Sequence, residues 1–235
     1  MPLSAYLRRA RRAGIDLTVV MPSFPLDSQA ANREIAALVG RHPDRLVGFA
    51  WIDPRRDRGR LADLVAEADR LGLRGVKVHG HVATPGREVC EAALAHGFPL
   101  LLDVASRPHV VDLIAATFPQ LRLIVAHLGS FVDDWRAHRI VIDQLTRHRN
   151  VYADTSGVRR FDMLREAVRR AGAGKLLFGS DGPWLHPALE LEKVRLLRLA
   201  PAAERLMLGG NAAAILRRRT ADQTSLASSR ATPQY

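Results

Sequence analysis

The sequence of 235 residues has few of the features that mark secreted, membrane-spanning or nucleotide-binding proteins. Its single cysteine, Cys90, excludes a framework of internal disulfides and is typical of a reducing cytoplasm. The apolar runs are as short as Leu121 to Ala126, so we expect no membrane span. The N-terminus carries arginines but no apolar stretch with a small-residue cleavage site, which argues against a secretory signal. Neither GxGxxG nor a P-loop is present, so no nucleotide site is predicted.

Negative charge is also scarce, because 35 Lys and Arg residues face 24 Asp and Glu residues, giving a net charge of +11. A charge of this size could indicate a nucleic-acid partner. The arginines, however, recur at helical spacing, as Arg165, Arg169 and Arg170 do, and no basic stripe with interleaved aromatic residues is present. We therefore interpret them as the solvated outer faces of helices and expect no nucleic-acid binding.

What is present is one repeated pattern, in which a short apolar run is followed by an amphipathic segment. The predicted strands are Leu17–Met21, Leu46–Ile52, Gly75–His79, Pro99–Val104, Leu121–His127, Val151–Asp154 and Lys175–Ser180. The predicted helices are 3–13, 28–41, 58–71, 86–96, 107–118, 135–148, 160–171, 187–199 and 201–218. Gly14, Gly72, Gly97 and Gly172 stand where helices should end.

Polar residues follow nearly every predicted strand. Their presence at so many strand ends decides between two parallel α/β architectures. They are Ser23, Asp53, His79 with His81, Asp103, His127, Asp154 with Thr155, and Asp181. An open sheet concentrates its ligand contacts at one switch point, whereas a closed barrel carries functional groups at all its strand ends. The sequence therefore predicts a (β/α)8 TIM barrel as one domain over 1–218, followed by a disordered tail over 219–235. Seven strands are found where the barrel needs eight, and because a helix comes first, strand 1 is the missing one.

Several segments carry a family resemblance that covers nearly the whole chain before the tail. They include AGIDLTVVMPS (13–23), LRGVKVHGH (73–81), LRLIVAHLGS (121–130), NVYADTSG (150–157), KLLFGSDGPW (175–184) and GGNAAAIL (209–216). In this order and spacing, the sequence resembles the amidohydrolase-2 family of TIM-barrel hydrolases and decarboxylases. The resemblance implies a small-molecule substrate and a divalent metal, usually zinc, at the top of the barrel.

In metal-dependent members of that family, strand 1 supplies a His-x-His pair, strand 5 a histidine and strand 8 an aspartate. Asp181 matches the aspartate, and His127 matches a strand-6 histidine that assists the chemistry. The sequence departs from the pattern twice, because the His-x-His strand is absent and Asp103 stands where histidine is usual. Zinc needs about four ligands, and oxygen ligands favour a harder ion such as Mg or Mn. Because of these two departures, metal-independent lactone hydrolysis has to be considered beside the metal-dependent reactions of the family.

The predicted catalytic residues are Asp181, which would activate a water directly or through a metal, and His127, which would polarise a carbonyl. The predicted metal ligands are Asp181, Asp103 and His81, and the predicted substrate contacts are Lys77, His79 and Trp184. Structural alternatives remain open, because Asp181 could cap a turn and His127 could be a buried core histidine. The histidines on predicted helices are expected to face solvent; they are His42, His96, His109, His138 and His148.

The leading hypothesis for function is hydrolysis of a C–N or ester-type bond in a small molecule. Decarboxylation of a carboxylated ring and metal-independent lactone hydrolysis are alternatives within the same family. An alternative of another class is a truncated, inactive barrel that acts only in assembly, since the edges of strands 2 and 8 would be unpaired. We further expect a cytoplasmic location and homo-oligomeric assembly.

Overall fold

The computed structural model describes residues 2–105, 107–131 and 133–217, so the predicted tail at 219–235 lies outside the described residues. The strands are β1 (Thr18–Val20), β2 (Leu46–Gly48), β3 (Ala50–Trp51), β4 (Val76–His79), β5 (Leu100–Asp103), β6 (Leu123–Val125), β7 (Val151–Asp154) and β8 (Leu176–Leu177). The helices of the first half are α1 (Leu3–Arg12), α2 (Ser28–Arg41), α3 (Leu61–Arg70), α4 (Arg87–Ala95) and α5 (Val110–Thr117). The second half contains α6 (Trp135–Arg147), α7 (Phe161–Ala171), α8 (Pro187–Arg195), α9 (Pro201–Arg205) and α10 (Asn211–Leu216). Shorter helical turns are η1 (Ala126–Gly129), η2 (Ala173–Lys175) and η3 (Leu206–Gly210).

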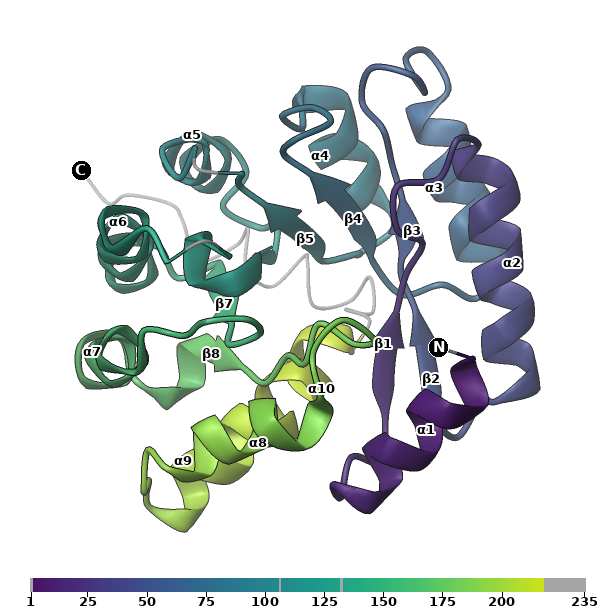
Figure 1. The fold of residues 1–235 in the computed structure, drawn as a ribbon. Coiled ribbons are helices and arrows are strands. Elements are labelled where there is room, and N and C mark those ends of the chain that lie inside the picture. Colours follow the sequence, from purple (N-terminus) through teal and green to yellow (C-terminus); the bar gives the residue numbers. More distant parts are fainter. Residues whose placement is uncertain (1, 106, 132, 218–235) are drawn as a thin grey trace, which may run out of the picture.

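All the strands pair in parallel, and the predicted alternation of strands and helices is confirmed. The strand order is β1-β2 in one ladder and β3-β4-β5-β6-β7-β8 in the other. Figure 1 shows helices α2 to α7 around the outside of these strands, as in a TIM barrel. The four glycines expected at helix ends all have positive φ, which suits the left-handed cap position.

The strand predicted over Leu46–Ile52 is divided in two at Phe49. Its first part pairs with β1, and its second part pairs with β4. The Phe49 ring lies over Gly75, where a Cβ would come within 2.5 Å of the ring. A change of partner within one apolar run leaves no trace in hydrophobic periodicity, so the sequence predicted one strand.

The two faces of each strand have different surroundings. One set of alternate residues, such as Val76, Val78, Leu100 and Leu102, belongs to the large core that packs against the helices. The other set faces the barrel interior, where Ile124, Leu177 and Ile215 form a small second cluster. Because Ile215 belongs to α10, the last described helix contributes to the interior packing. The inward side chains at the opposite, C-terminal ends of the strands are polar and form the site described below.

The barrel is open on one side, because β1 and β8 are not paired in the described part of the chain. Helix α1 packs against α8 at this side, and the Tyr6 hydroxyl lies 3.0 Å from Ser180 Oγ just after β8. Strand β8 is shorter than the predicted Lys175–Ser180, because the Phe178 N–H donates to the Met207 carbonyl of η3 at 2.8 Å instead of continuing the sheet. None of the described helices is long and apolar enough to cross a membrane.

Candidate active site

The C-terminal ends of β4, β5 and β6 bring two histidines to one carboxylate. His79 and Asp103 are register partners on β4 and β5, and His79 Nε2 lies 3.3 Å from Asp103 Oδ2. His127, which follows β6, places its Nε2 3.6 Å from the same oxygen. The predicted site residues His79, Asp103 and His127 therefore lie together, and Asp103 stands between the two imidazoles.

The backbone around His127 is held in an uncommon conformation. His127 and Leu128 have φ values of 56° and 49°, in the left-handed region that costs a non-glycine residue free energy. Two side chains fix this turn: Asp154 Oδ1 accepts the His127 N–H at 3.2 Å, and His138 Nδ1 lies 3.0 Å from the Leu128 carbonyl. The prediction that His138 faces solvent is therefore wrong, because this histidine is buried under the turn and supports it.

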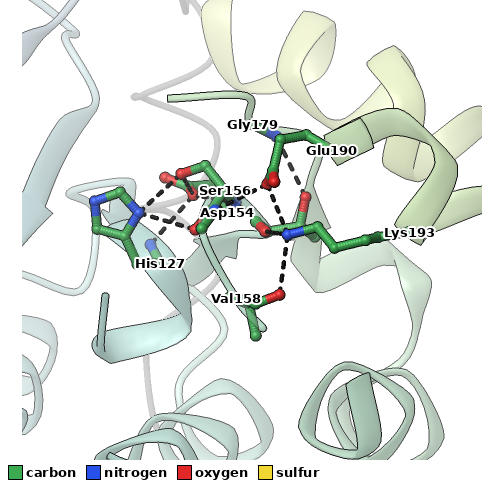
Figure 2. A network of polar contacts seen from close by, with 9 residues as sticks. His127, Asp154, Ser156, Val158, Gly179, Glu190 and Lys193 are labelled. Carbon is green, nitrogen blue, oxygen red and sulfur yellow. Dashed lines mark hydrogen bonds and ion pairs between the residues drawn. The ribbon is translucent and has the colours of Figure 1, made fainter. Parts of the chain in front are cut away.

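The hydrogen bonds of His127 determine which ring nitrogen carries the proton (Figure 2). Nδ1 lies 2.9 Å from the Ser156 carbonyl, which can only accept, so Nδ1 carries a hydrogen. Ser156 Oγ lies 2.9 Å from the same Nδ1 and donates its own hydrogen to Asp154 Oδ1 at 2.5 Å. In the neutral ring, Nε2 therefore holds the lone pair and presents it to the site as a base.

The loop that carries Ser156 is itself anchored by α8, as Figure 2 shows. The Gly157 N–H donates to Glu190 Oε2 at 2.9 Å, and Lys193 Nζ donates to the Val158 carbonyl at 2.9 Å. Glu190 and Lys193 also form an ion pair at 2.7 Å. This network explains how the orientation of His127 is kept. Ser156 was missed from the sequence because its contact with His127 joins residues that are distant along the chain.

His79 has the opposite tautomer. Its Nδ1 accepts the His81 N–H at 3.3 Å, so its hydrogen is on Nε2 and points to Asp103. Burial lowers the pKa of His79 to about 4 against the opposing charge of Asp103, so the ring is neutral at pH 7. Burial would raise the pKa of Asp103, but Lys77, His79 and the Ala105 N–H reverse this and keep it below its usual range.

A lysine and two further carboxyl groups complete the polar centre. Lys77 is 7% exposed on β4, and burial lowers its pKa while the charges of Asp103, Asp154 and Asp181 oppose that shift. Burial raises the pKa of Asp181. The charge of His127 opposes this shift, and the charge of Asp154 adds to it. Asp181 has a φ of 46°, so the turn after β8 holds this residue in an uncommon backbone conformation. Its electrostatic coupling to Lys77, Asp103 and His127 assigns Asp181 to the same centre.

Aromatic rings border this centre on the β1–β4 side. The Phe24 ring lies 4.6 Å from His79 and 5.3 Å from Trp51, and His81 stacks on His79 at 5.2 Å. Phe24 and Trp51 were not predicted, because an aromatic residue beside a strand end is equally typical of core packing. Trp184, predicted to contact substrate, is 73% exposed, and its backbone N–H donates to the Asp181 carbonyl at 3.1 Å.

The described residues contain no group of three or more His, Cys, Asp or Glu side chains placed to hold a metal ion. His81 is exposed and stacks on the His79 ring, and it forms no such group with Asp103 and Asp181. Metal ligation by these three residues therefore stays a prediction.

The depressed pKa of His79 predicts a pH dependence of stability. The unfolded chain binds a proton to this imidazole near pH 6.5, whereas the folded chain does so only near pH 4. Stability from this group is therefore present above pH 6.5 and lost as the pH falls toward 4, by up to about 3 kcal/mol. Urea unfolding between pH 7 and 4.5 measures this loss.

The variant His79→Gln should lose part of that pH slope, whereas His109→Gln, at an exposed histidine before α5, should keep it. The raised pKa of Asp181 acts in the opposite sense, so the difference between the native chain and His79→Gln isolates the contribution of His79. Equal slopes for the native chain and His79→Gln would contradict the assignment.

An imidazole with a free lone pair, a carboxyl group with a raised pKa and a buried lysine lie at the strand ends of a parallel barrel, where TIM-barrel enzymes carry their active sites. The model of the family described as Amidohydrolase matches residues 5–218. The chain therefore belongs to the amidohydrolase family, as the sequence resemblance indicated. A comparison with curated protein sequences finds no match.

Solved structures with the same fold include several decarboxylases. A 5-carboxyvanillate decarboxylase from Sphingomonas paucimobilis is 20% identical, with a TM-score of 0.74 over 92% of this chain and 83% of that one. A 2,6-dihydroxybenzoate decarboxylase from Rhizobium is 17% identical, with a TM-score of 0.74 over 92% and 88%. A dihydroxybenzoic acid decarboxylase from Polaromonas, solved with bound manganese and the inhibitor 2-nitroresorcinol, is 21% identical, with a TM-score of 0.68 over 94% and 88%. At these identities the likeness establishes the TIM-barrel fold.

Proposed function

We propose that this protein decarboxylates a small, hydroxylated aromatic acid. The observation that carries the proposal is a buried lysine beside a layer of rings. Lys77 is the register partner of Trp51, and the Trp51, Phe24 and His79 rings lie within 6.2 Å of one another. A ring-shaped substrate would pack against this layer and place its carboxylate on the ammonium group of Lys77. The names of the similar decarboxylases support this choice over the hydrolysis expected first.

The chain's own residues supply the two proton movements that the reaction needs. His127 Nε2 accepts the proton of a ring hydroxyl, because its lone pair faces the site. We assign to Asp181 the donation of a proton to the ring carbon that carries the carboxylate, because burial raises the pKa of this carboxyl group. The new C–H bond takes its electron pair from the ring. When the C–C bond then breaks, carbon dioxide leaves, and the electron pair of that bond restores the aromatic ring. His127 returns its proton to the ring oxygen, and Asp181 regains a proton from water.

The manganese in the Polaromonas structure agrees with the divalent metal that the family resemblance implies. In this chain, the donors of the described site do not form a three-ligand group, so the proposed steps are assigned to side chains alone. A cytoplasmic location and homo-oligomeric assembly remain predictions from the sequence.

The test is release of carbon dioxide from 2,6-dihydroxybenzoate and from 5-carboxyvanillate by the purified chain, with the ring product identified by chromatography. We expect Lys77→Met to lower kcat/KM by at least about tenfold through loss of the ion pair.

We also expect EDTA or added manganese to change the rate by less than about twofold, since no step uses a metal. Circular dichroism of each variant controls for loss of fold.

Other outcomes would contradict the proposal in distinguishable ways. Cleavage of an ester, lactone or amide without carbon dioxide would favour hydrolysis. Activity that requires stoichiometric manganese would favour the predicted ligands Asp181, Asp103 and His81. A folded chain that is inactive in all these assays would favour the assembly role.

A further inference from the structure

A cavity lies beside the active site, between the loops that follow β3 and β4. Its volume is about 420 Å³, and its walls include four arginines, Arg55, Arg58, Arg87 and Arg107, with Glu88 as the acidic residue among them. We call it the arginine cavity. Pockets of roughly 300–1,000 Å³ are of the size that holds small molecules.

The arginines of the 54–60 loop fall into two groups. Arg56 donates to the Pro25 and Leu26 carbonyls at 2.9 and 2.8 Å, and Arg60 donates to Gln29 at 3.4 Å. These two side chains tie the loop to the start of α2. Arg55 and Arg58 line the arginine cavity instead, and neither guanidinium makes a hydrogen bond or ion pair with any described residue. Two guanidinium groups without a hydrogen-bond or ion-pair partner among the described residues therefore face the arginine cavity.

The other two arginines of the cavity are already held in place. Arg87 is paired with Glu91 at 3.2 Å, and Arg107 donates to the Gly80 carbonyl in the loop between His79 and His81. Arg107 therefore joins the wall of the arginine cavity to the loop that borders the active site. Its remaining donors and those of Arg87 add to the positive potential of the hollow.

We propose that the arginine cavity binds the phosphoryl or carboxylate group of a small anionic molecule that is separate from the aromatic acid substrate. A guanidinium matches both groups through two parallel hydrogen bonds, so Arg55 and Arg58 together can hold one anion. Apolar atoms of Pro54, Leu61, Ala83 and Val89 form part of the same lining and would contact the body of such a ligand. This site is independent of the proposed decarboxylation.

The test is calorimetric titration of the full chain at low salt with two probes, pyrophosphate for the phosphoryl source and tricarballylate for the carboxylate source. We expect saturable binding of at least one probe and at least about tenfold weaker binding in the double variant R55Q/R58Q. The matched control is R41Q/R149Q, which removes the same charge at exposed arginines outside the cavity. A further variant, E88Q, should bind more tightly, because it removes the negative charge from the lining.

Slowed amide hydrogen exchange in residues 54–61 and 83–89 on addition of the probe would place binding in the cavity. Preference for pyrophosphate would identify a phosphoryl ligand, and preference for tricarballylate a carboxylate ligand. The proposal is overturned if neither probe saturates, or if R41Q/R149Q weakens binding as much as R55Q/R58Q. If the double variant fails to fold, R58Q alone and E88Q, with their opposite expected shifts, decide the question.

Discussion

Replacing Asp181 with asparagine is expected to lower kcat of the proposed decarboxylation by about 10²- to 10⁴-fold, the range associated with loss of a positioned acid or base. Asparagine has nearly the same shape and can keep the turn after β8, but its amide cannot donate a proton to the ring carbon. KM should change little, because the substrate carboxylate is assigned to Lys77. Steady-state kinetics on the chain as it exists measure both quantities.

The matched control for Asp181→Asn is Asp162→Asn. Asp162 lies at the start of α7, and its exposed carboxylate pairs with Arg160 at 2.6 Å outside the site. This variant should keep the native kcat within about twofold, as surface substitutions usually do. A kcat of Asp181→Asn close to the native value would remove Asp181 from the proton-donating role. A large rise in KM with native kcat would instead make Asp181 a binding residue.

The second large effect is expected in the core. Leu123 on β6 is fully buried between the sheet and the helices, and its register partners are Leu100 and Val151. Leu123→Ala should lower the free energy of unfolding by about 2–5 kcal/mol, because the surrounding strands cannot close the space that the side chain leaves. Urea unfolding followed by circular dichroism gives the difference directly.

Leu113→Ala is the control for this change, because it removes the same atoms from a leucine of α5 that is 69% exposed. We expect its effect to stay within about 0.5 kcal/mol. If the two variants lost equal stability, the assignment of Leu123 to the main core would be wrong.

Much of the fold could be predicted because the sequence repeats one physical pattern. Apolar runs alternating with amphipathic segments predict parallel strands covered by helices, and the strand ends must then meet on one side of the barrel. This reasoning placed His79, Asp103 and His127 at the same end. In the structure, the two imidazoles lie within 3.6 Å of the same Asp103 oxygen.

Details that depend on non-local contacts could not be predicted. His138 has the spacing of an exposed helical residue, yet it is buried because the strained turn at Leu128 needs its hydrogen bond. Arg55 and Arg56 are adjacent and chemically identical, but only the second finds carbonyl acceptors, about 30 residues earlier in the chain. Periodicity indicates which face of an element is apolar and contains no information about such partners.

The sequence by itself determined the order of strands and helices and the polar residues at the strand ends. These features follow from local patterning, since a strand buried on both faces must be apolar and its end need not be. The tertiary structure decided where the barrel is open and where one strand changes its partner. It also decided which nitrogen of His127 is basic, because that choice rests on the Ser156 carbonyl, 29 residues further along the chain.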